Sequence, residues 1–382
     1  MRKRKWKSRK GAALLALALA FVLGLSGTGL LDTQAAGPVE TGEECSLVIS
    51  AGDLFGEIRD VYEGLPEEHE IDVEEILSNL ELSVKLYRVA EIDAGADYTA
   101  LTDFSGVLLG KEGDTDRKTF GDKVASVNSD TSTEEWQEMA LAVAREVESE
   151  SLTAYSEEKL VTEDRTVTFE NIETGLYLVM AGKVDTPYYT YEFTPYLVSL
   201  PNNYYASDPE NPGAEDSWKY DVTMGLKPGR VERFGSLNIE KNLTGMSLLP
   251  GNDNAMFVFR VKIDPLGDLT TPYDKIVAVT FDSGGEKMLD TIGDIPAGAT
   301  VKVEEVYSGG GYTQTSVMPD PAKAIIKADD EPGSTPVTFT FTNEIDGTTT
   351  GGFGVVNQFT NEDDSWGWTQ ILDKGQTGEV DE

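Results

Sequence analysis

Leu237-Asn238-Ile239-Glu240-Lys241-Asn242-Leu243 carries an apolar residue at nearly every second position. Successive side chains of a β-strand point to opposite faces, so this alternation predicts a strand with one face buried. Runs of the same kind recur along the chain, separated by turn-rich stretches such as residues 202–215 and 308–311. The pattern is typical of antiparallel β-sandwiches and not of alternating βαβ units. The other predicted strands are residues 46–50, 82–89, 166–169, 176–180, 196–200, 220–224, 256–263, 276–281, 300–306 and 337–342.

Two helices are expected in the first half of the chain. Ser132 and Glu135 have the spacing of a capping box, and the apolar residues that follow share one face of a helix. A weaker helical pattern covers residues 72–80. We therefore expect an all-β fold whose first domain contains inserted helices.

The N-terminal residues have the three parts of a signal peptide. Residues 1–10 carry seven basic side chains, residues 11–31 are almost wholly apolar, and residues 33–36 offer a small-residue cleavage pattern. The alternative is an uncleaved anchor, since the apolar run approaches the length that spans a bilayer. We prefer cleavage, which predicts a secreted chain with no membrane segment.

The chain is strongly acidic. It has 68 aspartates and glutamates and 31 lysines and arginines, which gives a net charge of -37. Such a charge repels phosphate backbones and anionic lipids, so neither nucleic acid nor a membrane surface is an expected partner. The one cysteine, Cys45, cannot form an internal disulfide. A secreted fold of this kind must gain stability by another route.

Side chains for enzymatic chemistry are scarce. The one histidine, His69, lies in a run of acidic residues, which indicates a solvated loop. No phosphate-binding glycine loop follows a predicted strand, and the mature sequence has no Gly-x-Ser-x-Gly motif. Pairs of acidic residues are abundant, but in so acidic a chain they arise by chance. We therefore expect a protein that is not an enzyme and holds no cofactor or metal.

Two groups of motifs resemble sortase-assembled pilins of Gram-positive bacteria. Residues 167–179 (VTFENIETGLYLV), residues 190–201 (TYEFTPYLVSLP) and Trp218 resemble the N-terminal pilin domain. Residues 236–241 (SLNIEK) begin a second group, which is similar to a collagen-adhesin B-type domain. The resemblance implies two immunoglobulin-like β-sandwich domains in tandem. The other members of the second group are residues 256–259, 295–300, 303–307 and 337–343 (VTFTFTN).

These patterns divide the chain into five ranges. Residues 1–36 are the signal peptide, residues 37–227 the pilin-like β-sandwich domain with its helices, and residues 236–361 the collagen-adhesin B-type β-sandwich domain. Residues 228–235 break the alternation and concentrate basic charge, so we expect a linker there. Residues 362–382 are acidic and turn-rich and are expected to form a partly disordered C-terminal tail.

Strand parity directs three polar residues into the core of the second domain. Each shares its strand face with apolar residues: Lys241 with Leu237, Glu305 with Val303, and Asn343 with Phe341. The neighbouring Glu304 has the opposite parity. Burial disfavours both charges, so we expect a lowered pKa for the lysine and a raised pKa for the glutamate. A neutral amine is a nucleophile, and a protonated carboxyl can donate a hydrogen bond to an amide carbonyl.

In the family that the sequence resembles, these residue types form an intramolecular isopeptide bond. The resemblance implies attack of the Lys241 amine on the Asn343 carboxamide, proton relay by Glu305 and release of ammonia. Asn357 and Asn361 are alternative partners for the lysine. The bond would constrain the sandwich as a disulfide does elsewhere. The alternative is a charged pair at the rim of the sandwich and an unrelated asparagine.

Residues 218–227 (WKYDVTMGLK) resemble the pilin motif whose last lysine is the nucleophile for pilus polymerisation. Trp218, Val222 and Lys227 match that motif in spacing, whereas residues 225–226 replace its usual tyrosine and proline. The resemblance implies that a sortase uses Lys227 as its acceptor. The alternative is a solvated linker lysine.

We expect a secreted structural protein of the cell surface or a pilus, with other pilin subunits or a sortase as partners. The sequence shows no LPXTG-type signal, so no role as a sortase donor is expected. The alternative is a secreted adhesin that binds a host or matrix ligand without polymerisation. Exposed tyrosines at residues 188–191 or 204–205 are candidates for its contact patch.

Overall fold

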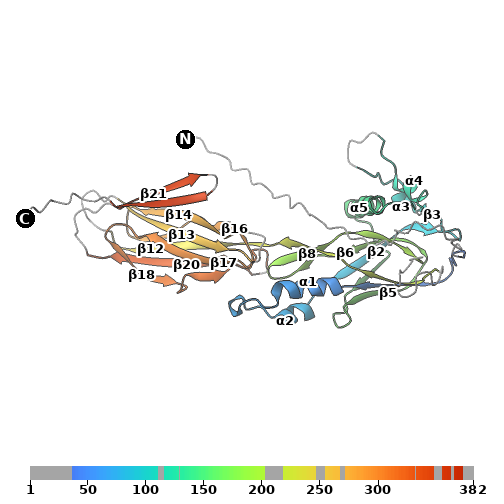
Figure 1. Cartoon of the computed structure of the whole chain (residues 1–382), viewed down its shortest axis with the longest axis horizontal. Coiled ribbons are helices and arrows are strands. Elements are labelled where there is room, and N and C mark those ends of the chain that lie inside the picture. Colours follow the sequence, from blue (N-terminus) through green and yellow to red (C-terminus); the bar gives the residue numbers. More distant parts are fainter. Residues whose placement is uncertain are drawn as a thin grey trace, which may run out of the picture. The chain divides into compact units, whose positions relative to one another are not determined.

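The computed structural model describes residues 37–110, 116–128, 130–202, 218–246, 254–266, 272–331 and 333–347, and the backbone of residues 355–362 and 365–372. The predicted signal peptide lies outside this part. The chain divides into two compact units. Unit 1 holds the described residues through Glu63, with Asp72–Val184 and Tyr191–Gly229, and unit 2 holds Gly64–Ile71, Asp185–Thr190 and the described residues from Arg230 onward. Strands predominate, so the all-β prediction is confirmed (Figure 1).

Two sheets form the framework of unit 1. In the first, of order β10-β1-β5, β10 (Asp221–Gly225) runs parallel to β1 (Cys45–Ser50), and β5 (Thr166–Ile172) runs antiparallel to it. Buried and partly exposed residues alternate along β1, as a half-buried strand requires. The second sheet has the order β3-β2-β6-β9, and β4 also pairs with β2. Its strands are β2 (Ser83–Ile92), β3 (Tyr98–Ala100), β4 (Ser156–Lys159), β6 (Gly175–Ala181) and β9 (Tyr196–Leu200).

Among the described residues, helices occur in the first half of the chain, and two of them confirm the sequence predictions. The longest, α5 (Thr133–Glu150), begins at the predicted capping box between Ser132 and Glu135 and buries the predicted apolar face. The second is α2 (Val73–Ser78), which Asp72 caps through its side chain. Three further helices were not expected from the sequence: α1 (Gly52–Tyr62), α3 (Thr102–Ser105) and α4 (Phe120–Val124).

Most of unit 2 consists of two sheets that share one hydrophobic core. One has the order β15-β12-β20-β18, with β16 also paired to β12, and the other has the order β14-β13-β17-β19. Strand β12 (Phe234–Thr244) is parallel to its neighbour β20 (Val337–Ile345), whereas β13 (Ala255–Asp264) is antiparallel to β17 (Thr300–Tyr307). The other strands are β14 (Tyr273–Phe281), β15 (Gly285–Met288), β16 (Ile292–Pro296), β18 (Tyr312–Met318) and β19 (Lys323–Ile325).

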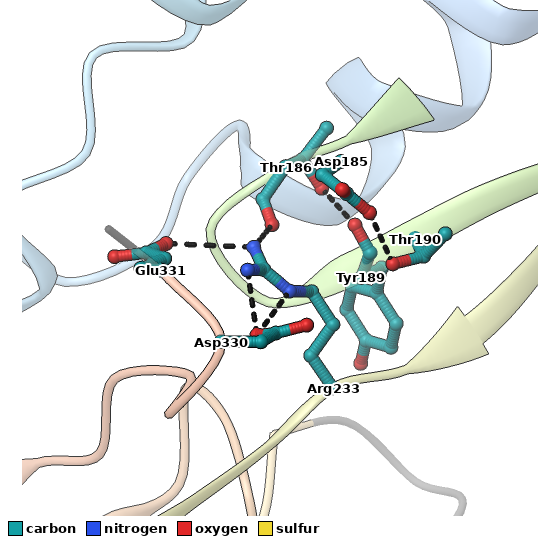
Figure 2. Close-up of polar contacts among 7 residues, drawn as sticks. All are labelled: Asp185, Thr186, Tyr189, Thr190, Arg233, Asp330 and Glu331. Atoms are coloured by element: carbon teal, nitrogen blue, oxygen red, sulfur yellow. Dashed lines mark hydrogen bonds and ion pairs between the residues drawn. The ribbon is translucent and has the colours of Figure 1, made fainter. Parts of the chain in front are cut away.

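Shorter elements complete the described chain. A small sheet has the order β11-β8-β7, from β7 (Val184–Asp185), β8 (Tyr189–Phe193) and β11 (Pro228–Glu232), and Glu67–His69 forms a 3₁₀ helix, η1. The turn Asp185–Thr190 belongs to unit 2. The side chain of Arg233 points into this turn and also contacts Asp330 (Figure 2).

Two of the predicted irregular regions are strands. The expected linker, residues 228–235, consists largely of β11 and the start of β12. Within the expected tail, residues 362–382, Ser365–Leu372 forms β22, which pairs with β21 (Val355–Glu362) in an antiparallel hairpin. Trp366 and Trp368 stand two positions apart, a spacing that suits a strand better than a turn. The rest of the expected tail lies outside the described residues.

Candidate functional site

Three strands bring Lys241, Glu305 and Asn343 together. Leu243 of β12 pairs with Asn343 of the parallel strand β20, so Lys241 and Asn343 lie two positions apart on the same face of one sheet. Glu305 lies on β17 in the other sheet, opposite Phe259 of β13. These three residues, called the triad below, therefore connect both layers of the sandwich. Strand alternation directs each of the side chains inward.

The triad is closed to solvent. Lys241 and Asn343 have 0% of their surface exposed, and the Glu305 side chain has 1%. Aromatic rings surround it, since Phe257 lies against the Lys241 nitrogen and Phe341 pairs with Lys241 in the strand register. An ionised group in such a place loses its hydration, so interactions within the triad decide its charge.

One carboxylate oxygen lies within reach of both nitrogens of the triad. Lys241 Nζ donates a hydrogen bond to Asn343 Oδ1 and lies 3.5 Å from Glu305 Oε1. Asn343 Nδ2 donates to the same Oε1 over 2.9 Å. From the sequence, the carboxyl was expected to face the amide oxygen, but the amide nitrogen faces it instead. Glu305 is therefore placed to exchange protons with the attacking and the leaving nitrogen.

Burial shifts both ionisable groups of the triad toward their neutral forms. Desolvation lowers the pKa of Lys241 to about 8, against the opposing effect of the Glu305 charge. Desolvation also raises the pKa of Glu305, against the opposing effects of Lys241 and Asn343. Glu305 Oε2 is buried without a hydrogen-bond partner among the described residues. An unpartnered oxygen costs less on a neutral carboxyl than on a carboxylate, which agrees with the raised pKa.

The alternative residues differ from the triad in position. Asn357 and Asn361 lie on β21, whose side chains are outside the described residues. Glu304 is half-exposed and forms ion pairs with Lys262 at 3.0 Å and Lys302 at 3.2 Å. It therefore lies on the outer face of its sheet, as its parity predicts.

The residues of the expected sortase acceptor motif lie along and beside β10 in unit 1. Trp218 Nε1 donates to the carbonyl oxygen of Gly37 over 2.7 Å, and Val222 is buried within β10. Lys227 is exposed, two residues beyond the end of β10. It borders a depression of about 390 Å³ together with acidic residues of α1. Those acidic residues are Asp53, Glu57 and Asp60.

Two predictions about exposed side chains are wrong. His69 was expected in a solvated loop, but it is buried and its Nδ1 lies 3.0 Å from the hydroxyl of Tyr188. Burial lowers the pKa of His69. Tyr188, Tyr189 and Tyr191, proposed as a contact patch for an adhesin, are all buried as well. The other candidates, residues 204–205, lie outside the described part of the chain.

Other reactive groups offer little chemistry within the described residues. No group of three or more His, Cys, Asp and Glu side chains there is arranged to hold a metal ion. The thiol of Cys45 is buried, and its burial raises its pKa to about 12, which makes a thiolate inaccessible. No helix in the same part of the chain has the length and apolar character to cross a membrane.

Sequence reasoning missed two residues at important positions. Phe257 places its ring 4.5 Å from the Lys241 nitrogen, and only its place in an alternating run, which marks it as a core residue, hints at this. Arg233 was assigned to the expected linker, yet it is 8% exposed and bonds three partners. The concentration of basic charge in residues 228–235 of an acidic chain was the available signal.

One known protein family matches part of the chain. A family model described as a domain of unknown function (DUF5979) matches residues 237–346, which contain the whole triad. No curated protein matches the chain.

Solved structures that match the chain include three pilins. The full-length major pilin SpaD from Corynebacterium diphtheriae is 11% identical, with 80% of this chain and 99% of that chain covered and a TM-score of 0.22. The minor pilin GBS52 from Streptococcus agalactiae is 17% identical, with 80% and 98% covered and a TM-score of 0.18. The basal pilin SpaE from Lactobacillus rhamnosus GG is 13% identical, with 80% and 91% covered and a TM-score of 0.26. All three are named as pilins.

Proposed function

We propose that this chain is a secreted, pilin-like structural subunit of a bacterial surface, whose unit 2 contains an isopeptide bond between Lys241 and Asn343. The buried triad is the observation that supports this most. It holds an amine of lowered pKa against a carboxamide and beside a carboxyl of raised pKa. A chain with one cysteine has no internal disulfide, so a cross-link of another kind suits an extracellular domain.

The proposed reaction exchanges one amide for another. The neutral Nζ of Lys241 attacks Cγ of Asn343 and forms a new C–N bond, and the bond from Cγ to Nδ2 breaks. Glu305 gives its proton to Nδ2, which leaves as ammonia, and receives a proton from Nζ. Glu305 ends as it began, so no further reactant is needed. Contact between the reacting groups in the folded core supplies the effective molarity.

The bond would join β12 to β20, the first and last long strands of the sandwich. Its ends are 102 positions apart in sequence. Because β12 and β20 are parallel neighbours, tension between the start of β12 and the end of β20 would pass through the bond. The strands between them would then carry little load, a property that suits a fibre subunit better than an enzyme.

The test of the cross-link is the intact mass of the folded protein. We expect it to be lighter by one ammonia than the sequence requires, because the amide exchange releases one. Lys241→Met and Asn343→Ala should each restore the full mass, whereas Lys302→Met, which changes an exposed lysine, should keep the deficit. A full mass for the unaltered protein would contradict the proposal. Peptide mapping that joins Lys241 to Asn357 or Asn361 would contradict the choice of Asn343.

We also propose that Lys227 is the residue through which a sortase joins this subunit to another. Its exposure just beyond β10 supports this, since an acceptor amine must be accessible to the enzyme. Trp218 and Tyr220 hold the start of the mature chain, through Gly37 and Glu40, against the segment that leads to Lys227.

Lys227→Arg is expected to abolish covalent multimers in the native host, because a guanidinium stays protonated and cannot act as the nucleophile. Immunoblots of cell-wall extracts under denaturing conditions measure this as the loss of a ladder. Lys219→Arg, which alters another exposed lysine of the same segment, is the matched control and should keep the ladder. A ladder that persists in Lys227→Arg would exclude this lysine as the acceptor.

A further inference from the structure

The face of one aromatic ring contacts the reacting nitrogen of the triad. Phe257 of β13 is fully buried, and its ring centroid lies 4.5 Å from Lys241 Nζ, inside the range of a cation–π contact. Phe257 and Glu305 both belong to the sheet opposite Lys241. The nitrogen therefore meets a carboxyl and an aromatic face from one layer, and a carboxamide from its own.

Neighbouring rings fix the orientation of Phe257. Phe281 packs edge-on against it, with centroids 5.8 Å apart and an interplanar angle of 87°. Tyr312 packs against it at 5.7 Å and 65°. With two such neighbours the ring has little freedom to turn away from Lys241, so its negative face is a fixed part of the site.

The protonated amine has three N–H groups to satisfy. Asn343 Oδ1 and Glu305 Oε1 account for two directions, and the Phe257 ring lies in contact with the same nitrogen. We infer that Phe257 is a positioning residue for the isopeptide reaction, which holds the Lys241 nitrogen against the Asn343 carboxamide and moderates its loss of the proton. The inference rests on the proposed function and adds to it a residue outside the triad.

The ring acts on the lysine in two ways. Its quadrupole stabilises the ammonium and not the amine, so it opposes the desolvation that lowers the pKa of Lys241. Its bulk also fills space beside the nitrogen and so limits the movement of the Lys241 side chain. The two effects are separable, because the first moves the pH at which the reaction accelerates and the second changes the rate once the amine is neutral.

Among the residues that the structure describes, two charged groups face Lys241 from the strands packed against it. Glu305 of β17 lies 3.5 Å away. Lys287 of β15 pairs with Lys241 in the strand register, but its own ammonium donates to the carbonyl oxygen of Thr280. A change at Phe257 leaves both groups in place, so a shift in the pH profile can be assigned to the ring.

The experiment measures ammonia loss during refolding of the full chain. Protein from inclusion bodies, dissolved in denaturant, is diluted into buffers that span the pKa of about 8 of Lys241. Mass spectrometry follows the cross-link and tryptophan fluorescence follows folding, so that the rate refers to folded molecules. Phe257→Leu is compared with Phe281→Leu, which removes a ring from the same cluster without touching the nitrogen.

The rate of ammonia loss should rise with pH as Lys241 loses its proton. Phe257→Leu is expected to move the midpoint of this rise down by about one pH unit, since the ammonium loses its aromatic partner. The plateau rate should fall about tenfold, because the nitrogen gains room to turn away. Phe281→Leu loosens the Phe257 ring but keeps it beside the nitrogen, so it should shift the midpoint less than Phe257→Leu. A ring-fluorinated phenylalanine at position 257 keeps the shape and weakens the quadrupole, so it should lower the midpoint without loss of stability.

The outcomes separate this inference from the proposal on which it rests. If the unaltered chain never loses ammonia, the cross-link itself is wrong. If it loses ammonia and the midpoint stays the same in both Phe257→Leu and the fluorinated protein, the cross-link stands and the role of Phe257 is overturned. Equal midpoint shifts in Phe257→Leu and Phe281→Leu would also overturn it, since they would indicate a general effect of packing.

Discussion

Replacing Glu305 by glutamine is expected to stop ammonia loss and to lower the free energy of unfolding of unit 2 by about 4 to 5 kcal/mol. Glutamine has nearly the shape of glutamate and can still accept a hydrogen bond from Asn343, so the fold should form. It cannot relay the proton that Lys241 must lose and Nδ2 must gain. The altered protein would therefore contain Lys241 and Asn343 side by side but not joined by a bond.

The size of the effect follows from the loop that the bond closes. Lys241 and Asn343 are 102 positions apart. A cross-link that closes a loop of about 100 residues removes conformational entropy worth about 4.7 kcal/mol from the unfolded chain. This is a large part of the stability of an ordinary domain, about 5 to 15 kcal/mol.

Hydrogen exchange of amides in β13 and β17 measures this change, because these central strands exchange only when unit 2 opens. Glu304→Gln is the matched control, since Glu304 adjoins Glu305 but lies half-exposed in ion pairs with Lys262 and Lys302. Glu304→Gln should lower the free energy of unfolding by less than about 1 kcal/mol, and this protein should still lose ammonia. A Glu305→Gln protein that loses ammonia at the normal rate would contradict the relay role.

Strand parity was sufficient to predict the inward direction of the triad. The alternation around Lys241 fixes which face of β12 is buried, and the same argument separates Glu305 from Glu304. Parity says nothing about which strands become neighbours, because that depends on contacts between residues far apart in sequence. The parallel pairing of β12 with β20, which brings Asn343 beside Lys241, therefore had to come from the structure.

Features that depend on close contacts between distant segments of the chain could not be predicted from the sequence. Gly235 was read as part of a linker, but a Cβ at this position would lie 1.9 Å from the carbonyl oxygen of Lys327. This glycine allows a tight backbone contact where β12 meets β16 and does not mark a flexible segment. Helix α1 was missed for a related reason, since Gly52 and Gly56 weaken its helical pattern. His69 was expected to be exposed because it lies in a run of acidic residues, and nothing in the sequence indicates that Tyr188 is its partner.

Arg233→Met is expected to destabilise unit 2 by about 2 to 3 kcal/mol. The guanidinium is almost completely buried, and its Nη1 donates to the carbonyl oxygen of Thr186 over 2.5 Å (Figure 2). Both Nε and Nη2 donate to Asp330 Oδ1, over 3.1 and 2.7 Å. Methionine fills much of the same space but offers no donor, so the buried carbonyl of Thr186 would be left without this bond.

The loss of stability in Arg233→Met should be concentrated in the turn Asp185–Thr190. Water can replace Arg233 beside Asp330, whose side chain is 66% exposed, but not beside Thr186, which is buried. The amide of Thr186 bonds to Tyr189 within the turn, and its hydrogen exchange reports whether the turn stays closed. We expect this exchange to accelerate more than that of β13.

Arg230→Met is the matched control for this prediction. Arg230 is exposed and lies over the ring of Tyr189, with its guanidinium carbon 4.8 Å from the ring centroid. Removing such a surface contact costs about 0.5 to 1 kcal/mol. If both substitutions have the same small effect, the buried guanidinium contributes no more than a surface one, and the turn is held by its backbone bonds and by Tyr188. If Arg233→Met alone opens the turn, the charge that the sequence analysis assigned to a linker is what fixes this segment to unit 2.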